Sequence, residues 1–221
     1  REARIRRVAL LGLGINVALA AFKMAAGVVG ASRAVVADAV HSISDCASDI
    51  ALLVGPSFWA RPSDSDHPYG HARIETVITV GIGLLLAASG LGIAYEALTS
   101  LRLHGSERPA LVALAAAATS VFVKEALYHW TLRVGRQVHS PAVLANAWHH
   151  RSDAFSSVPA VLAVGGAILL PSWSFLDHVG AVVVSLIILQ AAFRIVGPAL
   201  GQLIDTGLPD DERRAILETV A

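Results

Sequence analysis

Six long apolar runs limit what this chain can fold into. They cover residues 8–30, 34–57, 74–101, 110–132, 142–170 and 175–204. A helix of about 20 residues spans roughly 30 Å of hydrocarbon, and a slightly longer one does so with some tilt. A helix also satisfies its own backbone polar groups, as a chain inside lipid must. The runs therefore predict an all-α membrane protein with six transmembrane helices.

The composition supports a membrane protein and excludes other classes. Of 221 residues, 55% are hydrophobic and 15% are charged, and the mean hydropathy is +0.62. Soluble domains of this size rarely reach that balance. The net charge is zero, so no basic surface indicates a nucleic-acid partner. The single cysteine, Cys46, excludes an internal disulfide and a cysteine-rich metal site.

Arginines indicate the orientation of the chain in the membrane. If both termini are cytoplasmic, the outer loops hold only Arg33, Arg102 and Arg108. The inner face then collects the remaining loop and terminal arginines, which are Arg1, Arg4, Arg6, Arg7, Arg61, Arg73, Arg133, Arg136, Arg213 and Arg214. The positive-inside rule therefore predicts cytoplasmic termini and a cytoplasmic loop 61–73.

Two matched polar stretches lie inside the second and fifth apolar runs. ADAVHSISD at 37–45 aligns with ANAWHHRSD at 145–153, so that His41 and Asp45 match His149 and Asp153. Residues four apart on a helix face the same way, one turn apart. Both pairs fall within about two turns of the centre of their runs, so a shared site is geometrically allowed. Two imidazoles and two carboxylates suit a tetrahedral divalent metal such as zinc, and ferrous iron or cobalt is also chemically reasonable.

Ionisable residues inside a membrane are costly and normally mark an ion or proton pathway. Asp38 and Asn146 precede the pairs by three residues, either as partners that hold an imidazole or as helix-packing groups. Asp49 extends the polar stripe towards the cytoplasm and either lines the pathway or forms a salt bridge. Lys124 and Arg194 are interpreted as interfacial anchors or structural ion pairs.

The loop RPSDSDHPYGHAR at 61–73 holds a second group of metal-ligand side chains. Asp64, His67 and His71 resemble a metal triad. Pro68 and Gly70 predict an irregular backbone there, so helical spacing cannot place the three side chains together. Their spacing alone fits a solvated polar loop equally well.

Five motifs in a fixed order carry a family resemblance: ADAVHSISD, DHPYGHARIE, KEALYHW, ANAWHHRSD and LIDTGLPDDE. The chain resembles the cation diffusion facilitator family of divalent-metal/proton antiporters. Its KEALYHW and NAWHHRSD motifs are most similar to those of the zinc and iron branch. The resemblance implies that His41, Asp45, His149 and Asp153 hold the transported ion. It also raises the loop triad to a second metal site.

The resemblance has further implications outside the two metal sites. It implies a homodimer, and a pair between Arg73 and Asp205 at the cytoplasmic interface, with two solvated charges as the alternative. Family members usually continue into a cytoplasmic metal-binding domain. We therefore expect a transmembrane domain over residues 1–208, and interpret 209–221 as the start of a cytoplasmic domain that is truncated or absent.

The function expected from these observations is proton-coupled export of a divalent transition metal, with zinc or ferrous iron ahead of cadmium, cobalt and manganese. No permanently bound cofactor and no enzymatic activity are expected, and the expected location is a bacterial cytoplasmic membrane. A metal channel and a non-transporting metal sensor or scaffold remain as alternatives. An intramembrane metalloenzyme is disfavoured because nothing in the sequence resembles H-E-x-x-H.

Overall fold

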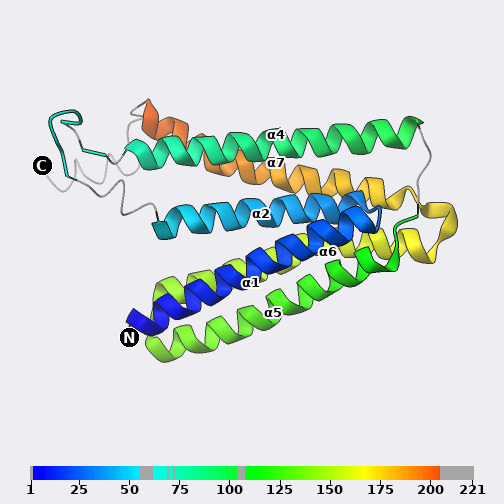
Figure 1. The fold of residues 1–221 in the computed structure, drawn as a ribbon, viewed down its shortest axis with the longest axis horizontal. Helices are drawn as coiled ribbons and strands as arrows, with labels where there is room; N and C mark the ends of the chain where they lie inside the picture. Colours follow the sequence, from blue (N-terminus) through cyan, green and yellow to red (C-terminus); the bar gives the residue numbers. More distant parts are fainter. Residues whose placement is uncertain (1, 55–61, 69, 72, 104–107, 205–221) are drawn as a thin grey trace, which may run out of the picture.

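The computed structural model describes residues 2–54, 62–68, 70–71, 73–103 and 108–204 (Figure 1). These residues form long helices and one short 3-10 turn, and none of them is in a strand. The predicted all-α fold is therefore confirmed. The helices are α1 (Glu2–Val29), α2 (Arg33–Val54), α4 (Arg73–Leu103), α5 (Leu111–Val138), α6 (Pro141–Leu169) and α7 (Leu176–Leu203), and the 3-10 turn is η1 (Pro171–Trp173).

Five of the described helices are long and apolar enough to cross a membrane: α1, α4, α5, α6 and α7. Helix α2 does not meet the same measure, although its 22 residues suffice in length, because it carries Asp38, Asp45 and Asp49. It lies against α1, α4, α6 and α7, which shield its polar side chains from lipid. The second predicted span, α2, is therefore a polar helix that its neighbours cover.

The helices begin and end close to the predicted bounds, except that α1 begins at Glu2, six residues before its apolar run, and α5 also extends further. Helix α5 continues to Val138 rather than ending near residue 132. Arginines and polar residues suit a helix that continues past the apolar layer, because their long side chains reach water. His139 ends α5 with φ 49° and ψ 49°, and the Ser140 side chain then caps α6 by accepting from the Val143 amide.

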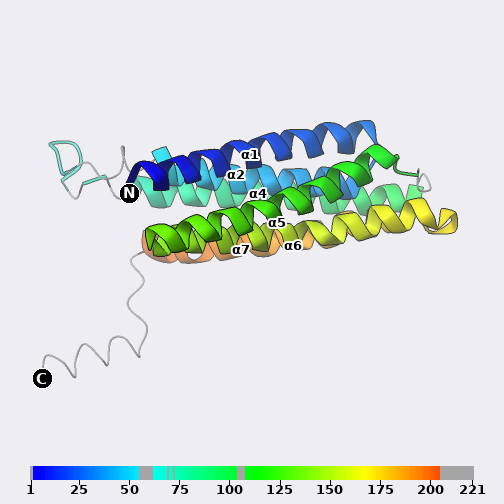
Figure 2. The same cartoon turned by 90° about the horizontal axis from the view of Figure 1, so that it is seen from below.

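The helices run side by side, with α4 against α7, α5 against α6 and α1 against α2 (Figures 1 and 2). Small residues permit this close approach. A Cβ atom at Gly180 of α7 would overlap Ala163 of α6 and lie 3.2 Å from the Ala34 Cβ of α2. Large apolar side chains cover the outside instead, and Leu85 and Phe193 are 72% and 79% exposed. The outer surface thus suits lipid.

The bundle has two distinct ends. At one end, here called the terminal end, α1 begins, α2 ends, α4 begins and α7 ends (Figure 1). At the other, here called the far end, α1 turns into α2 through residues 30–32. The orientation predicted from the arginines places the terminal end in the cytoplasm.

Candidate metal site

The two His-x-x-x-Asp pairs line one cavity. This cavity has a volume of about 770 Å³ and lies between α2, α4, α6 and α7. Helix α2 contributes His41 and Asp45, and α6 contributes His149 and Asp153. Two stretches 108 positions apart in the sequence therefore meet at one place in the fold.

Each pair is held within one turn of its own helix. His41 Nδ1 lies 3.9 Å from Asp45 Oδ1, and His149 Nδ1 lies 3.7 Å from Asp153 Oδ1. Both pairs line the same cavity from different helices. Within the described residues, however, the loop triad alone brings three ligand atoms within 4.8 Å of one another. The quartet therefore lines the cavity in an open arrangement.

Several ligand atoms of the quartet are buried without a hydrogen bond. His41 Nδ1, Asp45 Oδ2 and Asp153 Oδ2 have no hydrogen-bond partner among the residues that the structure describes. Buried polar atoms are nearly always hydrogen-bonded in native proteins, so each exception needs a physical reason. A cation bound in the cavity would supply one, since these atoms are of the types that ligate zinc-like ions.

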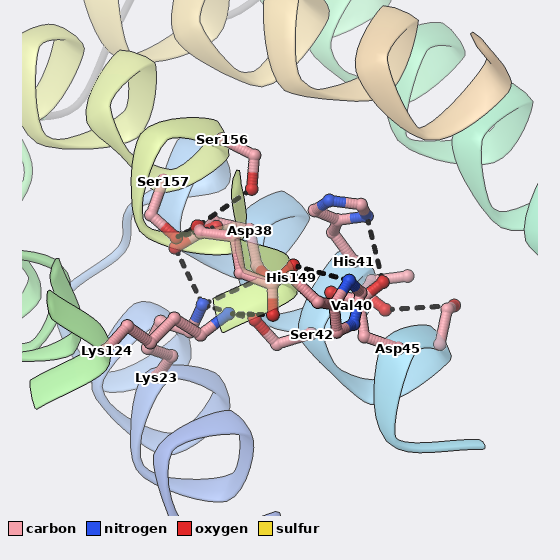
Figure 3. A network of polar contacts seen from close by, with 12 residues as sticks. Lys23, Asp38, Val40, His41, Ser42, Asp45, Lys124, His149, Ser156 and Ser157 are labelled. Atoms are coloured by element: carbon pink, nitrogen blue, oxygen red, sulfur yellow. Dashed lines mark hydrogen bonds and ion pairs between the residues drawn. The ribbon is translucent and has the colours of Figure 1, made fainter. Parts of the chain in front are cut away.

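Asp38 belongs to a buried network that joins three helices (Figure 3). Lys23 Nζ of α1 lies 2.9 Å from Asp38 Oδ2 and donates to Ser42 Oγ at 2.5 Å. Ser157 Oγ of α6 donates to Asp38 Oδ1 at 2.8 Å. These bonds link α1, α2 and α6. Asp38 thus contacts neighbouring helices, and its role beside the metal site stays a prediction.

The neighbouring polar residues divide between the cavity and the helix contacts. Asn146 lines the cavity, and its Nδ2 lies 3.3 Å from Nε2 of His150 rather than from the His149 ring. Asp49 also lines the cavity, one turn beyond Asp45 towards the terminal end. Asp49 thus shares the cavity with the quartet, and Asn146 contacts a histidine outside the quartet.

Sequence reasoning missed that Lys124 belongs to the site. Its Nζ atom lies 3.5 Å from Asp153 Oδ2, and the side chain is buried. Helix adjacency cannot be derived from one sequence, so neither this contact nor that of Lys23 was predicted. One feature of the sequence pointed to such a contact: Lys124 lies near the middle of α5, where a charge is costly unless it has a partner.

The loop triad converges in the structure. Asp64 Oδ1 accepts from the His67 amide at 2.7 Å, and Asp64 Oδ2 lies 3.5 Å from His71 Nε2. The two imidazole rings are 4.3 Å apart between centroids. The hydrogen bond from the His67 backbone amide lowers the pKa of the Asp64 carboxyl below its usual value, so the carboxylate is ionised. The irregular backbone thus gathers side chains whose spacing alone did not place them together.

The predicted pair between Arg73 and Asp205 lies partly outside the described residues. Arg73 is the first residue of α4, whereas residues 205–221 are not described. The pair therefore stays a prediction, as does the division at residue 208.

Comparison with known proteins gives the family. The chain matches the cation efflux transmembrane domain over residues 9–204. It is 36% identical to metal tolerance protein C1 of Arabidopsis thaliana, over 95% of this chain and 47% of that protein. It is 34% identical to the manganese efflux system protein MneP of Bacillus subtilis, over 93% and 70% of the two chains. Mitochondrial metal transporter 1 of Saccharomyces cerevisiae is 32% identical, over 97% and 46%.

The present chain spans about half the length of the plant and yeast relatives. The matched region contains all six long helices except the first turns of α1. The bundle is thus a cation efflux transmembrane domain, and the chain belongs to the cation diffusion facilitator family.

Proposed function

We propose that this protein moves a divalent transition-metal ion across a membrane, with His41, Asp45, His149 and Asp153 as its ligands. One observation carries the proposal: two His/Asp pairs from different helices line a single cavity inside a six-helix bundle. The unpaired ligand atoms and the family membership support it.

The cavity suggests the direction from which the ion is loaded. Its lining covers residues 75–82 of α4, 145–156 of α6 and 187–195 of α7, mostly on the terminal side of each helix midpoint. At the far end, Arg33 Nε of α2 lies 3.5 Å from Glu96 Oε1 of α4, so these helices approach each other there. We infer a conformation that receives metal from the terminal end, which is the cytoplasmic end in the predicted orientation. Export would begin from this conformation.

Zinc or ferrous iron is the proposed cargo, since two imidazoles and two carboxylates are typical ligands for both. The Bacillus subtilis relative is named for manganese, so this metal belongs in any direct comparison. Cadmium and cobalt are further candidates on ligand chemistry. Manganese is harder and prefers carboxylate oxygen to imidazole nitrogen.

Proton exchange follows from the chemistry of the ligands. A metal binds neutral imidazole and ionised carboxylate, so metal and protons compete for the same four side chains. Loading from the cytoplasm would release at least one proton, and protons from the other side would help to expel the metal. The protein would then act as an antiporter.

The loop triad of Asp64, His67 and His71 is proposed as a second metal site at the terminal end. It directly precedes α4, whose first turns line the cavity. The proposal also includes a homodimer, for which the family resemblance is the ground, and a bacterial cytoplasmic membrane. The relatives named above come from bacteria and eukaryotes alike, so they do not favour one kind of membrane.

Reconstitution of the purified protein into sealed liposomes would test the proposal. Zinc, iron(II), manganese and cadmium would be supplied separately, with a metal-sensitive and a pH-sensitive dye inside. Metal should accumulate in the lumen while protons leave it. Uptake no faster than in protein-free liposomes would refute transport, whereas uptake without opposing proton movement would indicate a channel.

A further inference from the structure

Lys124 is a buried cation beside the proposed metal site. It belongs to α5, which contributes none of the four proposed ligands. It lies near the middle of α5 and is 1% exposed. Its Nζ atom is 3.5 Å from Oδ2 of Asp153, one of the four proposed ligands. An ammonium group at such a depth is costly unless it has a partner of opposite charge. The partner here is a carboxylate that the proposed function also assigns to the metal.

The second buried lysine shows what a purely structural ammonium looks like in this bundle. Lys23 Nζ lies 2.9 Å from Asp38 Oδ2 and also contacts Ser42 Oγ and the Asp38 carbonyl oxygen. Its distance to the carboxylate is that of a charge-assisted hydrogen bond, typically about 2.7–2.9 Å. Asp38 is held again from the other side by Ser157. This ammonium is thus enclosed by groups that do not line the cavity.

The contact of Lys124 differs in length and in its partner. At 3.5 Å its distance to Asp153 is longer than that of a charge-assisted hydrogen bond. Asp153 Oδ2 accepts no hydrogen bond from the residues that the structure describes. The two groups therefore attract each other as charges, while the oxygen keeps its lone pairs available for a metal.

We propose that Lys124 is a resident counter-cation of the empty site, which competes with the transported metal for Asp153 and so limits the affinity of the site. This rests on the proposed function, since it requires that the quartet binds the metal. A divalent ion on Asp153 would lie within several ångströms of the ammonium, and Coulomb repulsion at that range weakens binding substantially in a partly buried site. Lys124 is then a positioning and affinity-setting residue rather than a ligand.

The positive charge of Lys124 should also speed the release of the metal. Asp45 and Asp153 line the same cavity, so a site that has lost both metal and protons would hold two carboxylates that repel each other. The ammonium offsets one of them when the metal has left. A carrier must release its ion and return empty, so a positive charge that stabilises the empty state should speed release. Without Lys124, the metal should bind more tightly and leave more slowly.

Lys124→Met tests this proposal, because methionine keeps the length of the side chain and removes the charge. Lys124→Arg keeps the charge, and Arg133→Met removes a charge from an exposed position of the same helix. Zinc or manganese binding would be measured by calorimetry on the purified protein in detergent, and KM and kcat in liposomes. Lys124→Met should bind metal at least about tenfold more tightly, with KM and kcat both lowered. Lys124→Arg and Arg133→Met should stay near the wild type.

The outcomes separate this proposal from the proposed function. A folded Lys124→Met that binds metal equally or more weakly would show that Lys124 only supports the geometry of Asp153, while wild-type transport would leave the proposed function standing. A wild type that binds neither metal would overturn both. If Lys124→Met does not fold, Lys124→Gln takes its place, because its amide can still donate to Asp153. Loss of folding in both neutral variants would make Lys124 a structural ion-pair residue and overturn the proposal.

Discussion

The buried carboxylate at the far end of the bundle and those of the quartet in its middle differ in their hydrogen bonds. At the far end, Asp177 of α7 is 1% exposed, and both of its oxygens accept hydrogen bonds. Oδ1 accepts from Ser32 Oγ at 2.6 Å and from the Ala34 amide at 3.4 Å, and Oδ2 accepts from the Arg33 amide at 2.7 Å. These donors include the first amides of α2, which need an acceptor outside their helix. Asp177 therefore joins α7 to the start of α2.

In the middle of the bundle, Asp45 and Asp153 each keep one buried oxygen without a hydrogen bond from the described residues. An unpaired buried polar atom costs about 1–3 kcal/mol, so such atoms persist where they have another use. The difference teaches how to separate structural from functional polar groups inside this membrane domain. A carboxylate with both oxygens bonded holds helices together, whereas one with a free oxygen is available to a cation.

The largest expected effect is loss of transport when a mid-bundle carboxylate is removed. Asp45→Ala and Asp153→Ala should each lower metal transport about 100-fold or more, because each removes a proposed ligand, and even the partners of metal ligands are worth about 10–100-fold in metal affinity or activity. Asp45→Ala should leave the unfolding temperature near that of the wild type, since Asp45 Oδ2 has no hydrogen bond to lose. Asp153→Ala should lower the unfolding temperature, because it leaves the buried ammonium of Lys124 without its partner. Ser156→Ala is the matched control, as Ser156 lines the same cavity but bonds to a backbone oxygen. Wild-type rates in both alanine variants would show that the quartet does not hold the ion.

The opposite pattern is expected at the far end. Asp177→Ala leaves Ser32 Oγ and the Arg33 amide without their acceptor, and the free energy of unfolding should fall by about 2–4 kcal/mol. Thermal unfolding of the purified protein in detergent measures this loss. Asp177→Asn should lose less, because its amide oxygen still accepts one of these bonds. Transport per folded molecule should remain near the wild type, and a selective loss of transport would break the contrast between the two regions.

Metal preference should shift by an intermediate amount. His41→Asp replaces an imidazole by a carboxylate, which suits harder ions, so the ratio of manganese to zinc transport should rise about tenfold. Competition between the two metals in liposomes measures this ratio. His41→Asn serves as the control, because it removes the imidazole without adding a charge. An unchanged ratio in His41→Asp would mean that His41 does not contact the ion.

The sequence predicted the helices better than the contacts between them. Length and apolar composition depend on local residues, so all six runs became helices, while the polar start of α1 and the polar end of α5 extend beyond the apolar runs. The spacing in each His-x-x-x-Asp pair is likewise local, and it correctly predicted that each pair faces one side of its helix. The ion pairs of Lys23 with Asp38 and of Lys124 with Asp153 join different helices, and their partners depend on helix adjacency.

The proton gradient should change the transport rate by a few-fold. Metal and protons compete for the mid-bundle ligands, so acid on the side of release should speed metal exit and a protonophore should slow it. Asp177 is already fully bonded and should take no part, so the Asp177→Asn variant should respond to the gradient as the wild type does. Flux measured at several imposed gradients tests both statements. A rate independent of the gradient would favour a channel.

The smallest effect is expected from the loop triad, which lies outside the buried bundle. Asp64 and His67 are exposed, and water competes with a metal for such ligands more than it does in the mid-bundle cavity. A double change of His67 and His71 to alanine should therefore remove one weak metal-binding site per chain while lowering transport less than about threefold. Calorimetric stoichiometry, measured beside the flux in liposomes, separates the two effects. Asp66→Ala is the control, because Asp66 is an exposed carboxylate of the same loop that lies outside the triad. A loss of transport as large as that of Asp45→Ala would place the loop triad on the obligatory path of the ion, and burial would then no longer distinguish the transporting site from the peripheral one.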